Sequence, residues 1–456
     1  MVQPASKRLV TEATIKDPTS VPGAYLNSTY APGAKVPTPA GFGLTTLTVP
    51  TIQRLGGGRF FAQLDLEAMR PAAGVTYYVA PSGVDTNTGL SAASPITIPG
   101  AMGKADVGTI IYAPGEYFRD THATTATTKS INHLASGPGV KVTGWNSWGA
   151  TLWTLTSGSI YQTARSGVEQ VVDVNNRTSW GDYTQYVKKA DLASITGAGQ
   201  WAIVGSTVYV WAIGNTDLTV QANRTQIRLG LAGLVTGIDA TAGTHYVRGI
   251  DFEGNSTRGL RCTGTALVIA EDCTFRYSGA SNGLSADGGR GVILRRCEAS
   301  SNLLDGFNYH HTSGTRLDFI EVDCRSHHNG LGNPGSNNAT TCHEDVRGIR
   351  VGGYYDNSGG PVVADVNSAQ TWNLGCYAGT STAAGLQNVC WRADAVGFES
   401  TPATMWIDEC VAEGSSIAYY ATSAVMHVNG SRVSKCPTVS TATGATGVVD
   451  LYKPAA

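Results

Sequence analysis

The stretch that decides the fold reads Gly291-Val292-Ile293-Leu294-Arg295-Arg296-Cys297-Glu298-Ala299. Apolar and polar residues partly alternate in it, and they alternate more clearly in residues 315–324. Alternation with a period of two is typical of a β-strand that has one buried and one exposed side. Asn, Gly and Ser interrupt the chain after such strands, as at residues 300–302 and 356–359. The pattern therefore predicts short strands separated by turns.

The same pattern recurs along residues 234–433. A Gly followed by a large apolar residue is one landmark, and a second landmark, most often Cys, follows that apolar residue by 12 to 17 residues. Successive second landmarks are 23, 24, 27, 29, 23 and 34 residues apart. Repeats of about 20–50 residues are typical of solenoids. The first landmarks are Gly237-Ile238, Gly259-Leu260, Gly283-Leu284, Gly306-Phe307 and Gly397-Phe398, and the second are Ile250, Cys273, Cys297, Cys324, Gly353, Cys376 and Cys410.

We therefore expect an all-β chain that forms a right-handed, single-stranded parallel β-helix with one coil per repeat. Coils of such a solenoid stack at the inter-strand spacing of ~4.8 Å, so a position that recurs in each repeat forms a column along the axis. Five of the nine Cys residues occupy one such position. An interior stack of small apolar thiols is favoured over disulfides or metal binding, since no Cys-x-x-Cys motif occurs.

Composition excludes several classes of protein. Charged residues make up 14% of the 456 residues and the net charge is −2, so nothing indicates nucleic-acid binding. No run of 18 or more apolar residues occurs, and we expect no membrane insertion. Residues 1–8 lead into no apolar core like that of a signal peptide, which predicts export by another route or release by lysis of a host.

The chain divides into four predicted parts. Residues 1–73 are rich in Pro, Gly and Ala and have little capacity for a core of their own, so they form either an anchor or docking arm or a disordered leader. Residues 74–235 contain the first coils, a cap and a long insertion. Residues 236–435 form the regular coils, and the Ser-, Thr- and Ala-rich residues 436–456 form a C-terminal capping tail.

Two phrases in residues 77–117 carry a resemblance. Pro81, Gly83, Asp85, Asn87 and Gly89 are spaced as Pro-x-Gly-x-Asp-x-Asn-x-Gly, and residues 113–117 read Ala-Pro-Gly-Glu-Tyr. Both resemble the opening of the right-handed β-helix proteins of the pectate-lyase-like group. The resemblance implies the β-helix fold with a short helix that caps the first coil. The group includes lyases, hydrolases, epimerases and virus tailspikes, so it does not fix an activity.

With its Pro- and Gly-rich leader, the chain also resembles phage tailspike and tail fibre proteins. That resemblance implies a virion tail location, with residues 1–73 docked on other tail or baseplate proteins. It further implies a parallel homotrimer that binds, and often depolymerises, a host cell-surface polysaccharide. Two alternatives remain open: a secreted bacterial polysaccharide lyase or glycoside hydrolase, and a non-catalytic structural tail protein.

Polar residues collect just after several of the first landmarks, and in a β-helix they would stack as one outward column. Glycosidic cleavage needs two carboxyl groups, about 5 Å apart for retention and about 6.5–9.5 Å apart for inversion of configuration. Glu344 and Asp365 are the expected pair on adjacent coils, at ~4.8 Å, and Asp287 and Glu344 the pair two coils apart, at ~9.6 Å. The predicted substrate-binding residues are His310, His311, His343, Asp345, Arg347 and Glu399.

Other interpretations of these residues stay open. A lyase would need Arg347 and Arg350, or Ca²⁺, to neutralise a uronate, but no motif supports Ca²⁺, and we predict no metal or cofactor. Asp287 and Asp305 could instead bond backbone N–H groups in turns. The pair His327-His328 is more typical of surface residues than of metal ligands. Trp and Tyr residues between 145 and 186 are more typical of packing than of sugar-stacking platforms.

Overall fold

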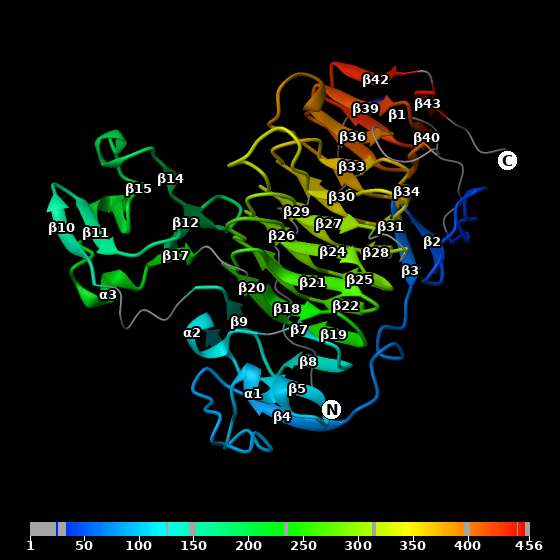
Figure 1. The fold of residues 1–456 in the computed structure, drawn as a ribbon. Helices are drawn as coiled ribbons and strands as arrows, with labels where there is room; N and C mark the ends of the chain where they lie inside the picture. Colours follow the sequence, from blue (N-terminus) through cyan, green and yellow to red (C-terminus); the bar gives the residue numbers. More distant parts are fainter. Residues whose placement is uncertain are drawn as a thin grey trace.

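The computed structural model describes residues 24–25, 33–124, 126–145, 152–231, 236–311, 316–395, 402–444 and 446–451. The protein is a right-handed parallel β-helix with 6% helix, which confirms the predicted fold class (Figure 1). Three long sheets of ten, eleven and twelve strands run along its axis.

The ten-stranded sheet holds the first strand of each regular coil. Its strands are β7 (Ala126–Thr127), β18 (Thr236–Ala240), β21 (Arg258–Gly264), β24 (Leu284–Gly288), β27 (Phe307–His310), β30 (Thr340–Cys342), β33 (Val363–Val366), β36 (Val389–Asp394), β39 (Ile417–Thr422) and β42 (Thr438–Thr443). Except for the first and last, all pair in parallel with a strand from the preceding and the following coil.

The twelve-stranded sheet follows after a short turn. Its strands are β4 (Val75–Val79), β5 (Val107–Tyr112), β8 (Ile131–Ala135), β19 (Thr244–Arg248), β22 (Leu267–Glu271), β25 (Gly291–Arg295), β28 (Asp318–Val322), β31 (Arg347–Val351), β34 (Gln370–Leu374), β37 (Thr404–Asp408), β40 (Val425–Asn429) and β43 (Val448–Leu451). The last strands of both sheets come from residues 438–451, so most of the predicted tail extends the stack of coils.

The eleven-stranded sheet completes each coil. Its strands are β1 (Ala24–Tyr25), β6 (Gly115–Tyr117), β9 (Val140–Thr143), β20 (Ile250–Glu253), β23 (Thr274–Arg276), β26 (Glu298–Ser300), β29 (Arg325–His327), β32 (Tyr354–Asp356), β35 (Tyr377–Ala378), β38 (Val411–Glu413) and β41 (Arg432–Ser434). β1 pairs antiparallel with β41, whereas the other neighbours pair in parallel.

A two-residue turn between the twelve- and eleven-stranded sheets explains the Cys landmark. The first turn residue takes a positive φ, as in Asp272 (54°), Arg296 (53°) and Asp323 (52°). The second turns its side chain inward, and in most coils it is Cys. Cys273, for example, is fully buried, and its thiol lies 3.3 Å from the carbonyl oxygen of Glu271. All five landmark cysteines are free and buried, which confirms the predicted interior stack.

A short helix closes the N-terminal end of the solenoid, as the resemblance implied. This helix, α1 (Ile98–Gly103), begins after Thr97, whose Oγ1 accepts a hydrogen bond from the Gly100 amide at 3.0 Å. Ile98, Ala101 and Met102 on α1 pack into the main core with residues of β4 and β5. The helix thereby covers apolar side chains that a further coil would otherwise cover.

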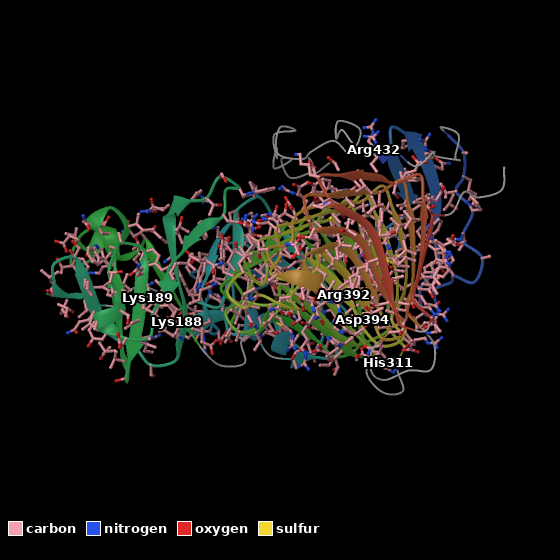
Figure 2. All side chains as sticks on the ribbon, turned by 90° about the horizontal axis from the view of Figure 1, so that it is seen from above. Lys188, Lys189, His311, Arg392, Asp394 and Arg432 are labelled. Atoms are coloured by element: carbon pink, nitrogen blue, oxygen red, sulfur yellow. The ribbon has the colours of Figure 1, made fainter. Side chains whose placement is uncertain are left out.

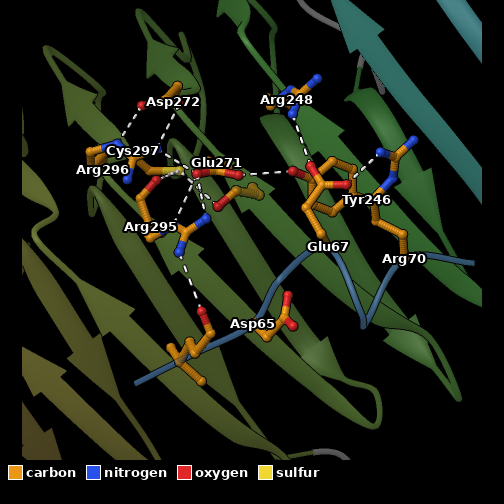
Figure 3. Close-up of polar contacts among 12 residues, drawn as sticks. Asp65, Glu67, Arg70, Tyr246, Arg248, Glu271, Asp272, Arg295, Arg296 and Cys297 are labelled. Atoms are coloured by element: carbon orange, nitrogen blue, oxygen red, sulfur yellow. Dashed lines mark hydrogen bonds and ion pairs between the residues drawn. The ribbon is translucent and has the colours of Figure 1, made fainter. Parts of the chain in front are cut away.

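The described part of the N-terminal segment lies on the outer face of the twelve-stranded sheet. A hairpin of β2 (Thr51–Gly56) and β3 (Arg59–Gln63) packs there, with residues 33–47 before it and residues 64–70 after it (Figure 1). Arg54 Nε lies 2.7 Å from Glu409 Oε1. Glu67 Oε1 lies 3.0 Å from Arg248 Nη1 (Figure 3). Residues 33–70 thus find their packing partner within the same chain; we call them the arm.

An insertion after β9 forms a separate β-unit at the side of the β-helix (Figure 1). A five-stranded sheet contains β10 (Thr154–Ser157), β11 (Ile160–Ala164), β16 (Thr207–Trp211), β15 (Gln200–Val204) and β14 (Val187–Lys188), and a three-stranded sheet contains β13 (Tyr183–Gln185), β12 (Val168–Arg177) and β17 (Ile227–Leu231). The unit also includes η3 (Leu192–Ser194), η4 (Ile213–Asn215) and α3 (Gln221–Arg224), whereas α2 (Arg119–His122) and η5 (Gly385–Gln387) lie in loops of the β-helix.

The insertion has its own hydrophobic core, which explains most of the aromatic residues there. Trp153, Trp201 and Tyr186 are buried in that core, and Trp145 and Tyr183 are buried where the insertion meets the coils. Trp148 lies outside the described residues. None of the helices in the described residues is long and apolar enough to cross a membrane.

Candidate functional site

The outer face of the ten-stranded sheet carries a column of polar side chains at the end of its strands. Asp287 on β24 pairs with His310 on β27, and Tyr309 pairs with Cys342 on β30. His343, the residue after Cys342, therefore stands opposite His310. The two imidazole rings are stacked, with centroids 3.9 Å apart and planes inclined by 16°.

Glu344 completes this group, and we call His310, His343 and Glu344 the Glu344 cluster. His310 Nδ1 lies 3.3 Å from Glu344 Oε2, and the same oxygen accepts a hydrogen bond from the His311 amide at 3.1 Å. The His310 side chain is 36% exposed and that of Glu344 is 26% exposed. The cluster therefore joins an imidazole and a carboxylate at a place that solvent, and hence a ligand, reaches.

His343 is held in the neutral form. Burial, together with the adjacent His310, lowers the pKa of His343 to about 3. Its Nε2 lies 3.3 Å from Thr341 Oγ1. A neutral imidazole can accept a hydrogen bond from a hydroxyl group but carries no extra proton to give, so His343 is suited to orienting a ligand or the His310 ring.

His311 and Asp345, two of the predicted substrate-binding residues, flank the cluster. His311 Nδ1 lies 2.7 Å from Asp345 Oδ1, and Arg316 Nε donates to Asp345 Oδ2 at 2.6 Å. Asp345 is thus held by two cationic or potentially cationic groups on one side of the cluster. Arg316 was missed in the sequence, because its position relative to Asp345 follows only from the coil geometry.

Asp287 lies one coil before His310 and sits among arginines. Its Oδ2 lies 3.2 Å from Arg261 Nε and 3.3 Å from Arg258 Nη2, and Arg261 also lies 3.7 Å from Asp239 Oδ2. The sequence analysis did not single out these arginines. Arg261 could have been found on the preceding coil, because it lies two residues before Thr263, which pairs in register with Asp287.

The expectation that Asp365 stacks outward beside Glu344 is wrong. Asp365 pairs with Cys342, whose side chain points inward, and it is fully buried. Its Oδ1 lies 3.1 Å from Arg350 Nη1, and that arginine is fully buried too. Both residues belong to an ion-paired group inside the solenoid, so neither Asp365 as a catalyst nor Arg350 as a uronate ligand is accessible to a polysaccharide.

Arg347 also faces away from the cluster. It begins β31 on the twelve-stranded sheet, and its Nη1 donates to the carbonyl oxygen of Gly43 in the arm at 2.8 Å. This arginine therefore holds the arm, which corrects its predicted role in substrate binding. Glu399 lies outside the described residues.

Asp305 has the structural role expected of a turn residue. Its carboxylate accepts hydrogen bonds from the Asn338 amide at 2.6 Å and from Asn308 Nδ2 at 2.7 Å. Burial raises the pKa of Asp305 to about 6. Asn308 and Thr341, although they point outward, are also buried, so the accessible part of this face is the column that ends in the Glu344 cluster.

A second polar group lies where the insertion meets the eleven-stranded sheet. Asp182 from the turn before β13 reaches His327 at the end of β29, with 3.6 Å between Asp182 Oδ2 and His327 Nδ1. Trp180 stacks on His327 with ring centroids 5.1 Å apart. Both Asp182 and His327 are buried, so the prediction that His327-His328 is a surface pair is wrong for His327.

Figure 2 shows how these regions are separated. The labelled Arg392, Asp394 and His311 lie along the same side of the β-helix, whereas Lys188 and Lys189 lie on the insertion. Arg392 and Asp394 are the paired polar residues of β36 and continue the outward face of the ten-stranded sheet beyond the Glu344 cluster.

No protein-family model matches this chain, and neither does any curated protein. Among solved structures, XylC in complex with xylose has a TM-score of 0.48 at 11% identity, over 78% of this chain and 70% of that chain. The pectate lyase Pel9A has a TM-score of 0.39 at 14% identity, over 79% and 78%. The A-module of an Azotobacter vinelandii mannuronan C-5 epimerase has a TM-score of 0.35 at 10% identity, over 77% and 94%. Likenesses this low carry no argument about activity, which has to rest on the residues of this chain.

Proposed function

We propose that this chain is a carbohydrate-active protein that binds an extended polysaccharide along the ten-stranded sheet and cleaves it at the Glu344 cluster. The observation that carries the proposal is the partly exposed pair of His310 Nδ1 and Glu344 Oε2, 3.3 Å apart. An imidazole and a carboxylate at this distance can hold and pass on a proton, which is what cleavage of a glycosidic bond requires.

The surroundings of the pair favour a polymeric ligand. Polar side chains on the outer face extend from Asp239 and Arg261 on early coils, through Asp287, to the Glu344 cluster. On the next coil Ala364 and Val366 of β33 face outward, and polar side chains return at Arg392 and Asp394 of β36. Successive coils are ~4.8 Å apart, so a chain of sugars lying along the axis meets donors and acceptors on several successive coils. A small ligand would have no use for polar groups spread over this many coils.

Hydrolysis is the reaction that the carboxyl groups favour. Glu344 protonates the glycosidic oxygen, with His310 beside it as the group that returns the proton, and Asp287 activates a water molecule from the other end of the site. Asp287 and Glu344 are separated by two coils, or ~9.6 Å along the backbone. That separation is close to the range of about 6.5–9.5 Å that leaves room for a water molecule in inverting enzymes.

Arg258 and Arg261 favour one alternative reaction, β-elimination of an acidic polysaccharide. Both guanidinium groups lie within 3.3 Å of Asp287 Oδ2, near enough to the column to neutralise a uronate carboxylate. His310 would then abstract the proton next to that carboxylate. Elimination leaves an unsaturated sugar that absorbs ultraviolet light, whereas hydrolysis does not, so the product separates the two reactions.

The test is release of reducing ends from purified capsule or lipopolysaccharide by the wild-type chain and by Glu344→Gln. We expect the substitution to lower kcat by about 10²–10⁴, the usual contribution of a general acid or base. Glu67→Gln is the matched control, because Glu67 lies on the arm with a 55% exposed side chain. Equal activity of the wild type and Glu344→Gln would place cleavage elsewhere, and binding without release would make the chain an adhesin.

We further propose that the chain acts as a virion tailspike or tail fibre that carries this site to a host-surface polysaccharide. The exposed side of the arm hairpin supports such a role, because Leu55 is 53% and Phe61 is 50% exposed there. Exposed apolar pairs are common where a protein contacts other subunits. Other tail or baseplate proteins, or the neighbouring chains of a homotrimer, would cover them.

Light scattering after size exclusion tests the assembly. A trimer that Phe61→Ser dissociates would support the tailspike, with His310→Ser as a control on the opposite face. A monomer that cleaves polysaccharide would instead favour a free-standing bacterial enzyme.

A further inference from the structure

We propose that Asp182, His327 and His328 form a site for a divalent transition-metal ion of the zinc class, which fastens the insertion to the β-helix. The site lies outside the Glu344 cluster and does not depend on the proposed cleavage. Each of the three residues offers one possible ligand atom, and these three atoms lie within 4.8 Å of one another.

The two imidazoles are arranged so that their nitrogens converge. His327 Nδ1 and His328 Nδ1 lie 2.8 Å apart while the ring planes are inclined by 88°. Asp182 Oδ2 lies 3.6 Å from His327 Nδ1. Both separations are shorter than twice the zinc–ligand bond of about 2.0–2.2 Å, so these atoms can surround one ion. Two imidazole nitrogens and one carboxylate oxygen form a donor set that suits zinc and its neighbours better than Ca²⁺.

The groups behind the ligands hold them in place. The two oxygens of Asp182 accept hydrogen bonds from Ser300 Oγ at 3.0 Å and Ser301 Oγ at 3.1 Å. His327 Nε2 faces Glu298 Oε1 at 3.6 Å, so a carboxylate lies behind the imidazole on the side away from Nδ1. Partners of this kind, a carboxylate behind a histidine and donors behind an aspartate, are typical of metal sites.

The place of the site in the fold indicates what the ion does. Asp182 belongs to the turn between β12 and β13 of the insertion, whereas both histidines belong to one coil of the β-helix. Trp180 from the same turn covers both imidazoles, with ring centroids 5.1 Å and 5.2 Å from theirs. A bound ion would therefore tie the insertion to the eleven-stranded sheet, much as a crosslink does.

The Glu344 cluster also brings together two histidines and a carboxylate, but it is less suited to an ion. Its imidazoles are stacked with planes only 16° apart, so their nitrogen lone pairs lie in nearly parallel planes and do not converge. This makes His310→Ala the natural control.

Calorimetry on the full chain tests the proposal, with Zn²⁺ added after chelation and dialysis. We expect one tightly bound Zn²⁺ per chain and a higher Tm. Loss of a residue that only hydrogen-bonds a metal ligand typically weakens metal binding by about 10–100-fold. Asp182→Asn and His328→Ala remove ligands, so each should weaken Zn²⁺ binding by more than that. His310→Ala should leave Zn²⁺ binding unchanged. Circular dichroism and Tm of the metal-free variants should match those of the wild type.

Hydrogen exchange adds a readout of the crosslink itself. Zn²⁺ should slow exchange in residues 178–183 and 327–330 of the wild type but not of His328→Ala. Zinc affinity that is equal in the wild type and His328→Ala, or that is lost in His310→Ala instead, would overturn the proposal. If the 2.8 Å contact between His327 and His328 is only a hydrogen bond between two imidazoles, zinc affinity should be equal in the wild type and His328→Ala.

Discussion

The outer faces of the twelve- and ten-stranded sheets differ although the same repeat builds both. Outward side chains on the twelve-stranded sheet are mainly apolar, and Val36, Phe42, Ile52 and Phe60 of the arm bury them. The apolar outward residues are Tyr246, Ile269, Ile293, Ile320, Ile349 and Trp372. On the ten-stranded sheet, Asp287, His310 and Glu344 stay partly exposed. The first face stabilises the chain, and the second is left for a ligand.

This difference shows that the polarity of an outward column of side chains in a solenoid indicates what the column does. An apolar column predicts that another segment of chain covers it, since exposed apolar stripes along a whole sheet are costly in water. A polar column without a covering segment indicates binding. The following predictions test the difference, beginning with the largest expected effect.

Trp372→Ala should remove one of the main contacts between the arm and the twelve-stranded sheet. Trp372 is 1% exposed, its Nε1 donates to Asp408 Oδ2 at 2.6 Å, and Phe42 lies over it. We expect a loss of about 3–5 kcal/mol in the free energy of unfolding, as for other large-to-small core substitutions. Denaturant unfolding measures it. His310→Ala on the other face should change stability by no more than about 0.5 kcal/mol, and equal losses would mean that the two faces do not differ.

Acid should destabilise the protein through its buried histidines. Burial lowers the pKa of His245 to about 4 and that of His133 well below its usual value. Below pH 6.5 the unfolded chain binds these protons while the folded chain does not, so stability is lost as the pH falls from 6.5 to about 4. The shift of His245 corresponds to about 3 kcal/mol.

Unfolding measured between pH 7 and pH 4 should therefore become less pH-dependent in His245→Gln. The interpretation fails if the pH dependence of unfolding is the same in His245→Gln as in the wild type.

Arg54→Ala should have an intermediate effect, because it frees a nearly buried carboxylate under the arm. Arg54 Nε contacts both oxygens of Glu409, at 2.7 and 2.8 Å, and the Glu409 side chain is 4% exposed. We expect a loss of about 1–3 kcal/mol. Lys435→Ala breaks a similar pair with Glu413, but the lysine is 70% exposed, so the expected loss is about 0–1 kcal/mol. Thermal unfolding of the two variants compares them.

The sequence predicted the fold because its strongest signals are local. The alternation in β28 and the Cys at the second position of most two-residue turns both report which side chains face inward. Asp365 was misplaced because its coil lacks the Gly landmark, and an offset of one residue moves a side chain to the other face of a strand. Asp182 and Trp180 could not be predicted as partners of His327, since nearly 150 residues separate them and only the packing of the insertion brings them together.

The central claim is that a polysaccharide occupies the ten-stranded face at the Glu344 cluster. Hydrogen exchange with and without an oligosaccharide, taken from the surface glycan that the protein binds best, tests it most directly. We predict that the oligosaccharide slows exchange in residues 307–311 and 340–345 of the wild type. This protection should be lost in the double variant Glu344→Gln/His310→Ala. Exchange in residues 246–250 and in the arm should not change. Protection confined to the arm, to the twelve-stranded sheet or to the insertion would contradict the account.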